Sequence, residues 1–247
     1  QINEKLEVEP CIAKSWKISN DGLTYEFILR NDVYFHDDEL FPNGKGRKVV
    51  ASDFAYSFNR LIDSTVASTG GWLFNDKVDK NNPFEALNDT TFIIHLKVPF
   101  HPMLGMLSLQ YCSVVPKEVV THFGKDFRSH PVGTGPCKLV RWEENNVLIL
   151  TKNENYFERD TSGIKLPYLK GVRVSFVADR GTEFLQFSQG KLDFITGLDV
   201  SYKDKLLSRT GELLPEWKDE IVFEKMPYLN TEYLGISMGK QPYHSLK

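Results

Sequence analysis

NDGLTYEFILR, at residues 20–30, predicts a strand near the start of this chain and the turn before it. From Thr24 onward, ring-bearing or aliphatic side chains alternate with polar ones, which is the period-two pattern of a half-buried strand. Asn20-Asp21-Gly22 before it is a turn signal, and WKI at residues 16–18 is the predicted partner strand. The pattern therefore predicts a β-hairpin.

The period changes to that of a helix downstream of this hairpin. Residues 34–36 still extend the strand pattern, and a polar loop follows at 37–47. Residues 52–61 are predicted to form an amphipathic helix, because Ser52 is a good N-cap and Asp53 suits the first turn. The apolar face of this helix carries Phe54, Phe58 and Leu61.

The rest of the chain predicts two further sets of elements. The first set is a strand at 91–96, a short helix within 100–109, and a helical turn at 116–122 with Pro116 at its first position. The second set is a tight turn at 133–136, a hairpin of 137–142 with 147–152, a β-rich run at 172–177, a helix at 180–189 and a short buried strand at 193–195. The final strand, helix and strand suggest a parallel crossover unit, so the predicted class is α/β, mixed with α+β.

Composition excludes some classes of protein. The 247 residues include 41% hydrophobic and 13% aromatic side chains, which is enough for a sizeable core. The net charge is −3 with the two signs interspersed, which argues against a nucleic-acid partner. No apolar run approaches the roughly 18 residues of a membrane-spanning helix.

The N-terminal residues and the cysteines give evidence on the cellular compartment in which the protein works. The chain begins at Gln1 without an initiator Met, a basic segment or an apolar segment, so a signal peptide is either never present or already removed. Cys11, Cys112 and Cys137 lie far apart in sequence, without a CxxC pair, which argues against a zinc site and a full disulfide framework. Buried thiols are the favoured interpretation, and one bridged pair in an oxidising compartment stays open.

Candidate chemistry is sparse. His36-Asp37-Asp38-Glu39 suits a catalytic pair or a calcium loop less well than a solvated turn, because the spacing is not that of an EF-hand. His95 and His101 lack the spacing that would aim both at one metal ion. NGKGRK at residues 43–48 resembles a phosphate loop only in composition and is expected to be a mobile basic loop. We therefore expect no catalytic residue, no metal site and no cofactor.

Seven motifs occur in a fixed order along the chain. They are AKSW with SNDGLTYEF (13–16 and 19–27), LRNDVYFHD (29–37), VASDFAYSF (50–58), GTGPCKL (133–139), KNENYF (152–157), GKLDFI (190–195) and YLGIS (233–237). Together they resemble the motifs of the family 5 extracellular solute-binding proteins, the oligopeptide- and dipeptide-binding type. One departure is Cys137, where an aromatic residue is usual in the family.

The resemblance implies a fold and a domain organisation. The expected fold is lobe I of a type II periplasmic-binding-protein-like fold, truncated at both ends and without lobe II. Residues 1–131 would form the outer subdomain of lobe I, and residues 132–247 would form an incomplete α/β core subdomain. The lobe II residues that anchor a peptide in this family would be absent, so this chain alone is expected to bind weakly or not at all.

The resemblance also implies a function. The chain would belong to the substrate-binding component of an ABC importer, which captures peptides or similar small solutes and delivers them to permease subunits. It would be exported to the periplasm or cell envelope, where a lipid anchor would come from outside these residues. The expected ligand-binding residues are Gly70, Gly71, Trp72, Gln110 and Tyr111, because glycines admit close backbone approach and aromatic rings offer flat apolar faces.

Two alternatives stay open at this point. Within the family, the solute could be a nickel chelate or a sugar instead of a peptide. From another class, the chain could be a hydrolase, which would need a convergent set of acid, base and nucleophile that the sequence does not show.

Overall fold

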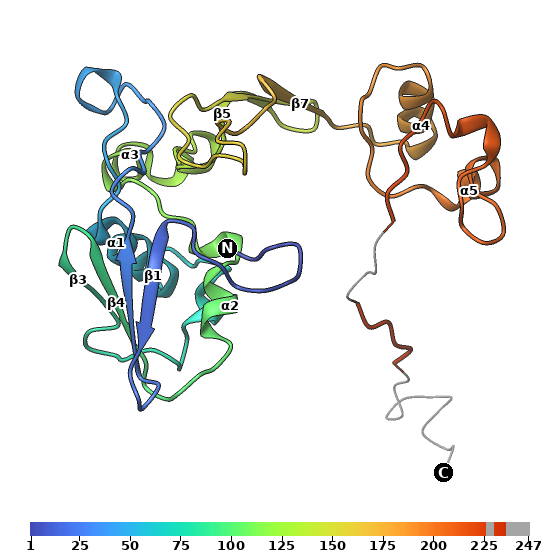
Figure 1. The fold of residues 1–247 in the computed structure, drawn as a ribbon. Coiled ribbons are helices and arrows are strands. Elements are labelled where there is room, and N and C mark those ends of the chain that lie inside the picture. The colour runs from blue at the N-terminus through green and yellow to red at the C-terminus, as the bar shows by residue number, and fades with distance from the viewer. Residues whose placement is uncertain (226–229, 236–247) are drawn as a thin grey trace, which may run out of the picture. The chain divides into compact units, whose positions relative to one another are not determined.

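The computed structural model describes residues 1–225 and 230–235, which fall into two compact units (Figure 1). The first unit is Gln1–Phe176 and the second is Val177–Lys247. The predicted subdomain boundary at 131/132 lies within the first unit and stays a prediction. No helix in the described part of the chain is both long and apolar enough to cross a membrane.

The predicted hairpin is confirmed and belongs to a four-stranded antiparallel sheet. Its strands are β1 (Ala13–Ile18), β2 (Thr24–Leu29), β3 (Phe84–Asn88) and β4 (Thr91–His95), in the order β1-β2-β4-β3. Tyr25, Phe27 and Leu29 are buried while their neighbours in β2 are half-buried, as the alternation predicts. Gly22 adopts a φ of +70° in the turn, a conformation that favours glycine.

Helix α1 (Ala51–Ile62) packs against this sheet through aromatic rings. The Phe58 ring lies 5.3 to 5.5 Å from the rings of Phe74, Phe84 and Phe92. The expectation of Ser52 as N-cap is wrong, because the helix already begins at Ala51 and Val50 occupies the cap position. The Asp53 carboxylate accepts the Val50 N–H at 2.9 Å and so satisfies an amide that the helix leaves unpaired.

Short helices connect α1 to the second sheet. The predicted helix within 100–109 is confirmed as α2 (Met103–Leu107). The predicted turn at 116–122 is α3 (Lys117–Phe123), with Pro116 at the N-cap instead of the first helical position. Short 3-10 segments occur at Pro42–Gly44, Gly71–Leu73, Gln110–Cys112, Gly124–Ser129 and Pro215–Trp217.

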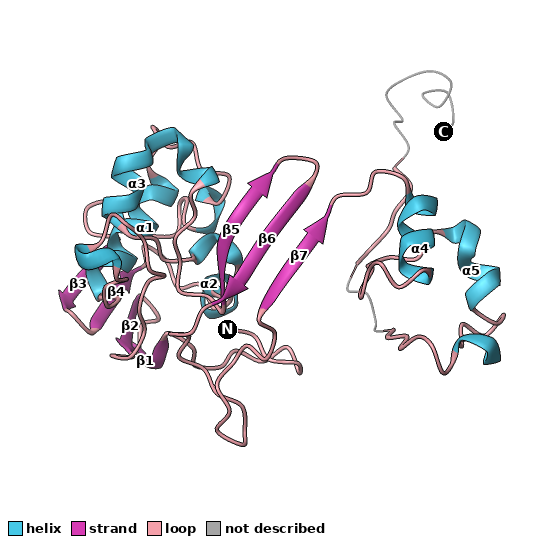
Figure 2. Cartoon of the chain, turned by 90° about the horizontal axis from the view of Figure 1, so that it is seen from above, coloured by secondary structure: helices cyan, strands magenta, loops and turns pink. Residues whose placement is uncertain are grey.

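The second sheet completes the first unit. Strands β5 (Cys137–Glu143), β6 (Val147–Lys152) and β7 (Gly171–Ser175) lie side by side in that order and pair antiparallel (Figure 2). The predicted hairpin of β5 with β6 is confirmed, and Asn146 N–H closes its turn on the Glu143 carbonyl at 3.1 Å.

The second unit corrects one prediction. It holds α4 (Arg180–Ser188), which confirms the predicted helix, and α5 (Val200–Leu206). The expected strand at 193–195 is wrong, since Phe194 is 76% exposed and no strand forms there. A three-residue run needs a neighbouring strand for its hydrogen bonds, and the described residues of this unit offer none.

The predicted parallel crossover is therefore wrong too, because every strand pair among the described residues is antiparallel. The motif at 233–237 lies partly outside the described residues, and its described part, 233–235, contains no strand.

Candidate functional site

The structure brings together the two loops that carry the predicted binding residues. A Cβ placed on Gly70 would lie 2.9 Å from both Cβ and Cδ1 of Tyr111, closer than real side chains approach one another. With the Tyr111 side chain in this position, only glycine fits at position 70. The sequence predicted close approach of this backbone to a ligand, whereas the structure shows close approach to a tyrosine ring.

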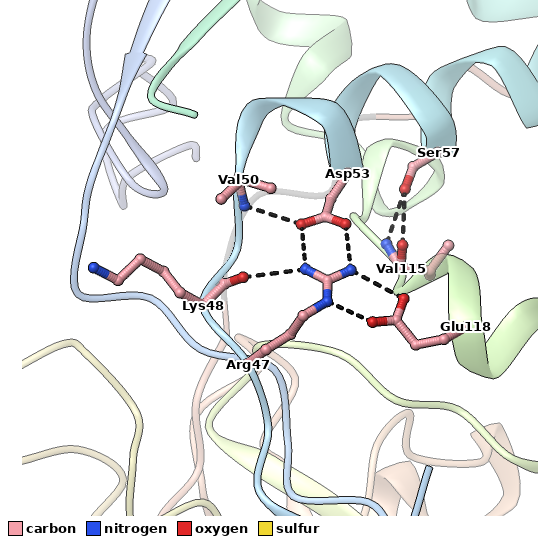
Figure 3. Close-up of polar contacts among 7 residues, drawn as sticks. All are labelled: Arg47, Lys48, Val50, Asp53, Ser57, Val115 and Glu118. Atoms are coloured by element: carbon pink, nitrogen blue, oxygen red, sulfur yellow. Dashed lines mark hydrogen bonds and ion pairs between the residues drawn. The ribbon is translucent and has the colours of Figure 1, made fainter. Parts of the chain in front are cut away.

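Helix α1 holds both loops in position. A Cβ on Gly71 would lie 2.8 Å from the Leu61 carbonyl oxygen, so the first loop packs directly on the end of the helix. In the middle of the helix, Ser57 Oγ accepts the Val115 N–H at 2.9 Å and fixes the segment that follows Tyr111 (Figure 3). The relative position of the two loops is thus set by one rigid element.

Three of the five predicted residues present side chains to solvent. Trp72 is 52% exposed, Tyr111 is 37% exposed, and Gln110 is exposed as well. Gly70 and Gly71 are buried beneath them. Accessible aromatic rings on a fixed backbone can stack on a solute at a low cost in side-chain entropy. The role of these residues toward a solute stays a prediction.

An ion-pair network ties the loop before α1 to α3. Arg47 Nη1 and Nη2 donate to the two oxygens of Asp53 at 2.8 and 2.7 Å, while Nε and Nη2 donate to Glu118 (Figure 3). These bonds, to Asp53 first and Glu118 second, raise the pKa of Arg47, and Arg47 lowers the pKa of Glu118. The expectation of a mobile loop at 43–48 is therefore wrong at Arg47.

His36 is also different from the expected solvated turn, because its side chain is buried. Its Nε2 lies 2.9 Å from the Gly135 carbonyl oxygen, and Nδ1 lies 3.4 Å from the Gly133 N–H. A carbonyl only accepts and an amide N–H only donates, so this geometry requires a neutral ring with its proton on Nε2. These two hydrogen bonds hold the loop that leads into β5 in place, and we call this contact the His36 clamp.

We expect this clamp to make stability depend on pH. Burial, the largest cause, lowers the pKa of His36 from its ordinary value of 6.5; Lys138 also lowers it, whereas the Gly135 carbonyl and Asp37 raise it. The folded state therefore binds the proton less well than the unfolded state. The contribution of His36 is complete above pH 6.5 and is lost as the pH falls below that value.

The check is urea unfolding at about pH 7.5 and 5.5, on either side of the ordinary histidine pKa. The midpoint should be lower at the acidic pH, and His36→Gln should remove most of that difference. An equal difference in both proteins would contradict the assignment of this pH dependence to His36.

Neither metal-binding nor cysteine clusters occur in the described residues. Among residues 1–225 and 230–235, no group of three His, Cys, Asp or Glu side chains could hold a metal ion. His95 pairs with Glu85 at 3.0 Å. Cys11, Cys112 and Cys137 are free thiols, so the option of a bridged pair is not realised in this structure.

Comparison with known families decides the identity of the chain. Residues 7–247 match the family model of bacterial extracellular solute-binding proteins, family 5 Middle. The chain belongs to this family. Membership confirms the resemblance seen in the seven motifs, and it places the chain in a non-enzymatic class of solute-binding proteins.

Individual relatives are similar over nearly the whole chain but are much longer. Heme-binding protein A of Haemophilus influenzae is 28% identical over 98% of this chain and 43% of its own length. The periplasmic binding protein DppA of Helicobacter pylori, solved in complex with the peptide STSA, is 30% identical with a TM-score of 0.70, over 81% of this chain and 40% of its own. NikZ of Campylobacter jejuni, solved in complex with Ni(L-His), is 26% identical with a TM-score of 0.65, over 78% and 36%.

The described structure is of mixed α/β class, and it aligns to 40% of the length of the H. pylori periplasmic binding protein.

Proposed function

We propose that this family 5 chain contributes the lobe I wall of the substrate-binding component of an ABC importer, and that the solute is a peptide or a similar small molecule. The approach of Gly70 to Tyr111, with exposed aromatic rings on a backbone fixed by α1, is the observation that carries the proposal. The H. pylori relative, which was solved with a peptide, supports the choice of solute.

In this mechanism the protein binds the solute and breaks no covalent bond. The solute lies against the exposed rings of Trp72 and Tyr111, while backbone groups of the two loops pair with its polar groups. A second wall, supplied by lobe II, closes over it in a hinge motion and excludes water. The loaded protein then docks on the permease subunits. In this proposal it works in the periplasm or cell envelope.

A nickel chelate is the second candidate solute. The observation in its favour is the C. jejuni relative, solved with Ni(L-His). The described residues hold no cluster of three protein ligands for a metal ion, so a nickel complex would have to bring its own ligands, such as histidine.

Native mass spectrometry of the full protein, purified from the cells that make it, tests the proposal. We expect a co-purifying peptide mass that exchanges with added STSA tetrapeptide, and no exchange with nickel–histidine. Exchange with nickel–histidine alone would show that the solute is a nickel chelate and not a peptide. Cleavage of the peptide, or the failure of both solutes to exchange, would contradict the proposal. The 247-residue chain alone should bind the tetrapeptide more weakly than micromolar affinity.

A further inference from the structure

The first unit contains an apolar cavity next to the candidate site. Its volume is about 240 Å³. The sheet supplies its floor through Phe27, Leu29, Phe92 and Ile94, and α1 adds the rings of Phe54 and Phe58. The volume exceeds the roughly 150 Å³ of an engineered apolar cavity that binds benzene, so it is large enough for one aromatic ring.

Apart from Glu9, no lining residue of this cavity has a charged side chain. Two of its polar lining groups are the thiols of Cys11 and Cys112. Burial raises the pKa of Cys112 to about 12 and raises that of Cys11 as well, so both thiols stay protonated at neutral pH and behave as small apolar groups. Glu9 also lines the cavity, where its carboxylate accepts the Gln1 side-chain amide at 2.9 Å.

The mouth of the cavity adjoins the predicted binding residues. The lining residues that are exposed to solvent include Leu109, Gln110 and Ser113. Gln1, from the start of the chain, is a further exposed lining residue. Gln110 is a predicted binding residue and the neighbour of Tyr111 in the same 3-10 turn. A solute held at Tyr111 can therefore reach the cavity past a polar edge formed by Gln110 and Ser113.

We propose that this cavity is a specificity subsite for one aromatic or branched aliphatic side chain of the captured solute. This inference rests on the proposed function, because the solute must already lie against the Gly70–Tyr111 face. The apolar lining accepts an apolar group and disfavours a charged one, because burial of a charge costs free energy and the one charged lining side chain, Glu9, already accepts a hydrogen bond from Gln1. Burial of a phenylalanine side chain would tighten binding about 10- to 100-fold over alanine.

The test compares tripeptides in calorimetric titrations of the full protein. Trialanine is the reference, and phenylalanine replaces alanine at each of the three positions in turn. We expect one position at which phenylalanine binds about 10- to 100-fold tighter. Ala13→Leu, which fills the cavity from β1, should bring this ratio close to one. Leu107→Ala, which enlarges the cavity from α2, should shift the preference toward tryptophan.

Controls separate the subsite from the proposed function. Leu87→Ala changes an exposed residue of β3 and should keep the ratio unchanged. Fluorine NMR with fluorobenzene tests the cavity in the 247-residue chain, since all of its lining residues lie in the first unit: the probe should bind the chain and not the Ala13→Leu variant. If fluorobenzene binds but no tripeptide does, the proposed function fails; if tripeptides bind with equal affinity and fluorobenzene does not bind, the subsite fails.

Discussion

Asp53→Ala should destabilise the first unit by about 2 to 5 kcal/mol, because it removes charge-assisted hydrogen bonds worth about 1.5 to 3 kcal/mol and a helix cap worth about 0.5 to 2 kcal/mol. The Asp53 side chain is only 5% exposed and accepts three hydrogen bonds, two from Arg47 and one from the Val50 N–H. Its loss leaves the Arg47 guanidinium with Glu118 alone and removes the cap of α1. The free energy of unfolding in urea measures the effect.

Two comparisons make this prediction specific. Glu118→Ala removes a half-exposed partner of Arg47, whose ion pair is worth about 1 kcal/mol or less. Glu39→Ala removes an exposed carboxylate and should change the free energy by less than about 0.5 kcal/mol. Equal losses for Asp53 and Glu39 would show that the network does not hold α1 in place.

Phe58→Ala is expected to cost a similar amount, about 3 to 5 kcal/mol, for a different reason. The ring is 3% exposed and touches aromatic rings from the loop after α1 and from both β3 and β4. Truncation removes these contacts and leaves a cavity that neighbouring rings fill only in part. Because α1 positions both loops of the candidate site, loosening of this core should also weaken solute binding.

Urea unfolding followed by circular dichroism checks this second prediction. Leu87→Ala is the matched control, because Leu87 is 62% exposed and its truncation creates no cavity. A loss for Phe58→Ala no greater than that of Leu87→Ala would contradict the assignment of Phe58 to the core.

Much of the first unit could be predicted because its signals are local. The alternation of Tyr25, Phe27 and Leu29 is enough to predict β2, and the turn at Gly22 fixes its partner. Strand β3 escaped prediction because its alternation is weak: Leu87 faces solvent, and Phe84 is the one buried side chain in the strand. Such a strand forms because it can pair with the free edge of β4. That pairing is a tertiary contact, which the local sequence pattern does not show.

The candidate site depends on contacts between distant segments. The sequence indicated each loop separately, from the glycines at 70–71 and from the aromatic residue at 111, but not that Gly70 packs on Tyr111. The contact of Arg47 with Glu118 and that of His36 with Gly135 were missed for the same reason, because these partners are far away in the chain. The apolar cavity could not be found from sequence, because it is the space that several elements leave unfilled.

One added methyl group tests whether the junction of Gly70 with Tyr111 forms a wall of the solute site. In the full protein, Gly70→Ala places a Cβ 2.9 Å from Tyr111, whereas Gly105→Ala adds the same group in α2 with no atom within 4 Å. Calorimetric titration with the best peptide from the mass-spectrometric screen compares the two variants with the parent protein. We expect a loss of affinity of about tenfold or more, or about 1.4 kcal/mol, for Gly70→Ala and none for Gly105→Ala. Unchanged affinity in a folded Gly70→Ala protein would contradict this expectation.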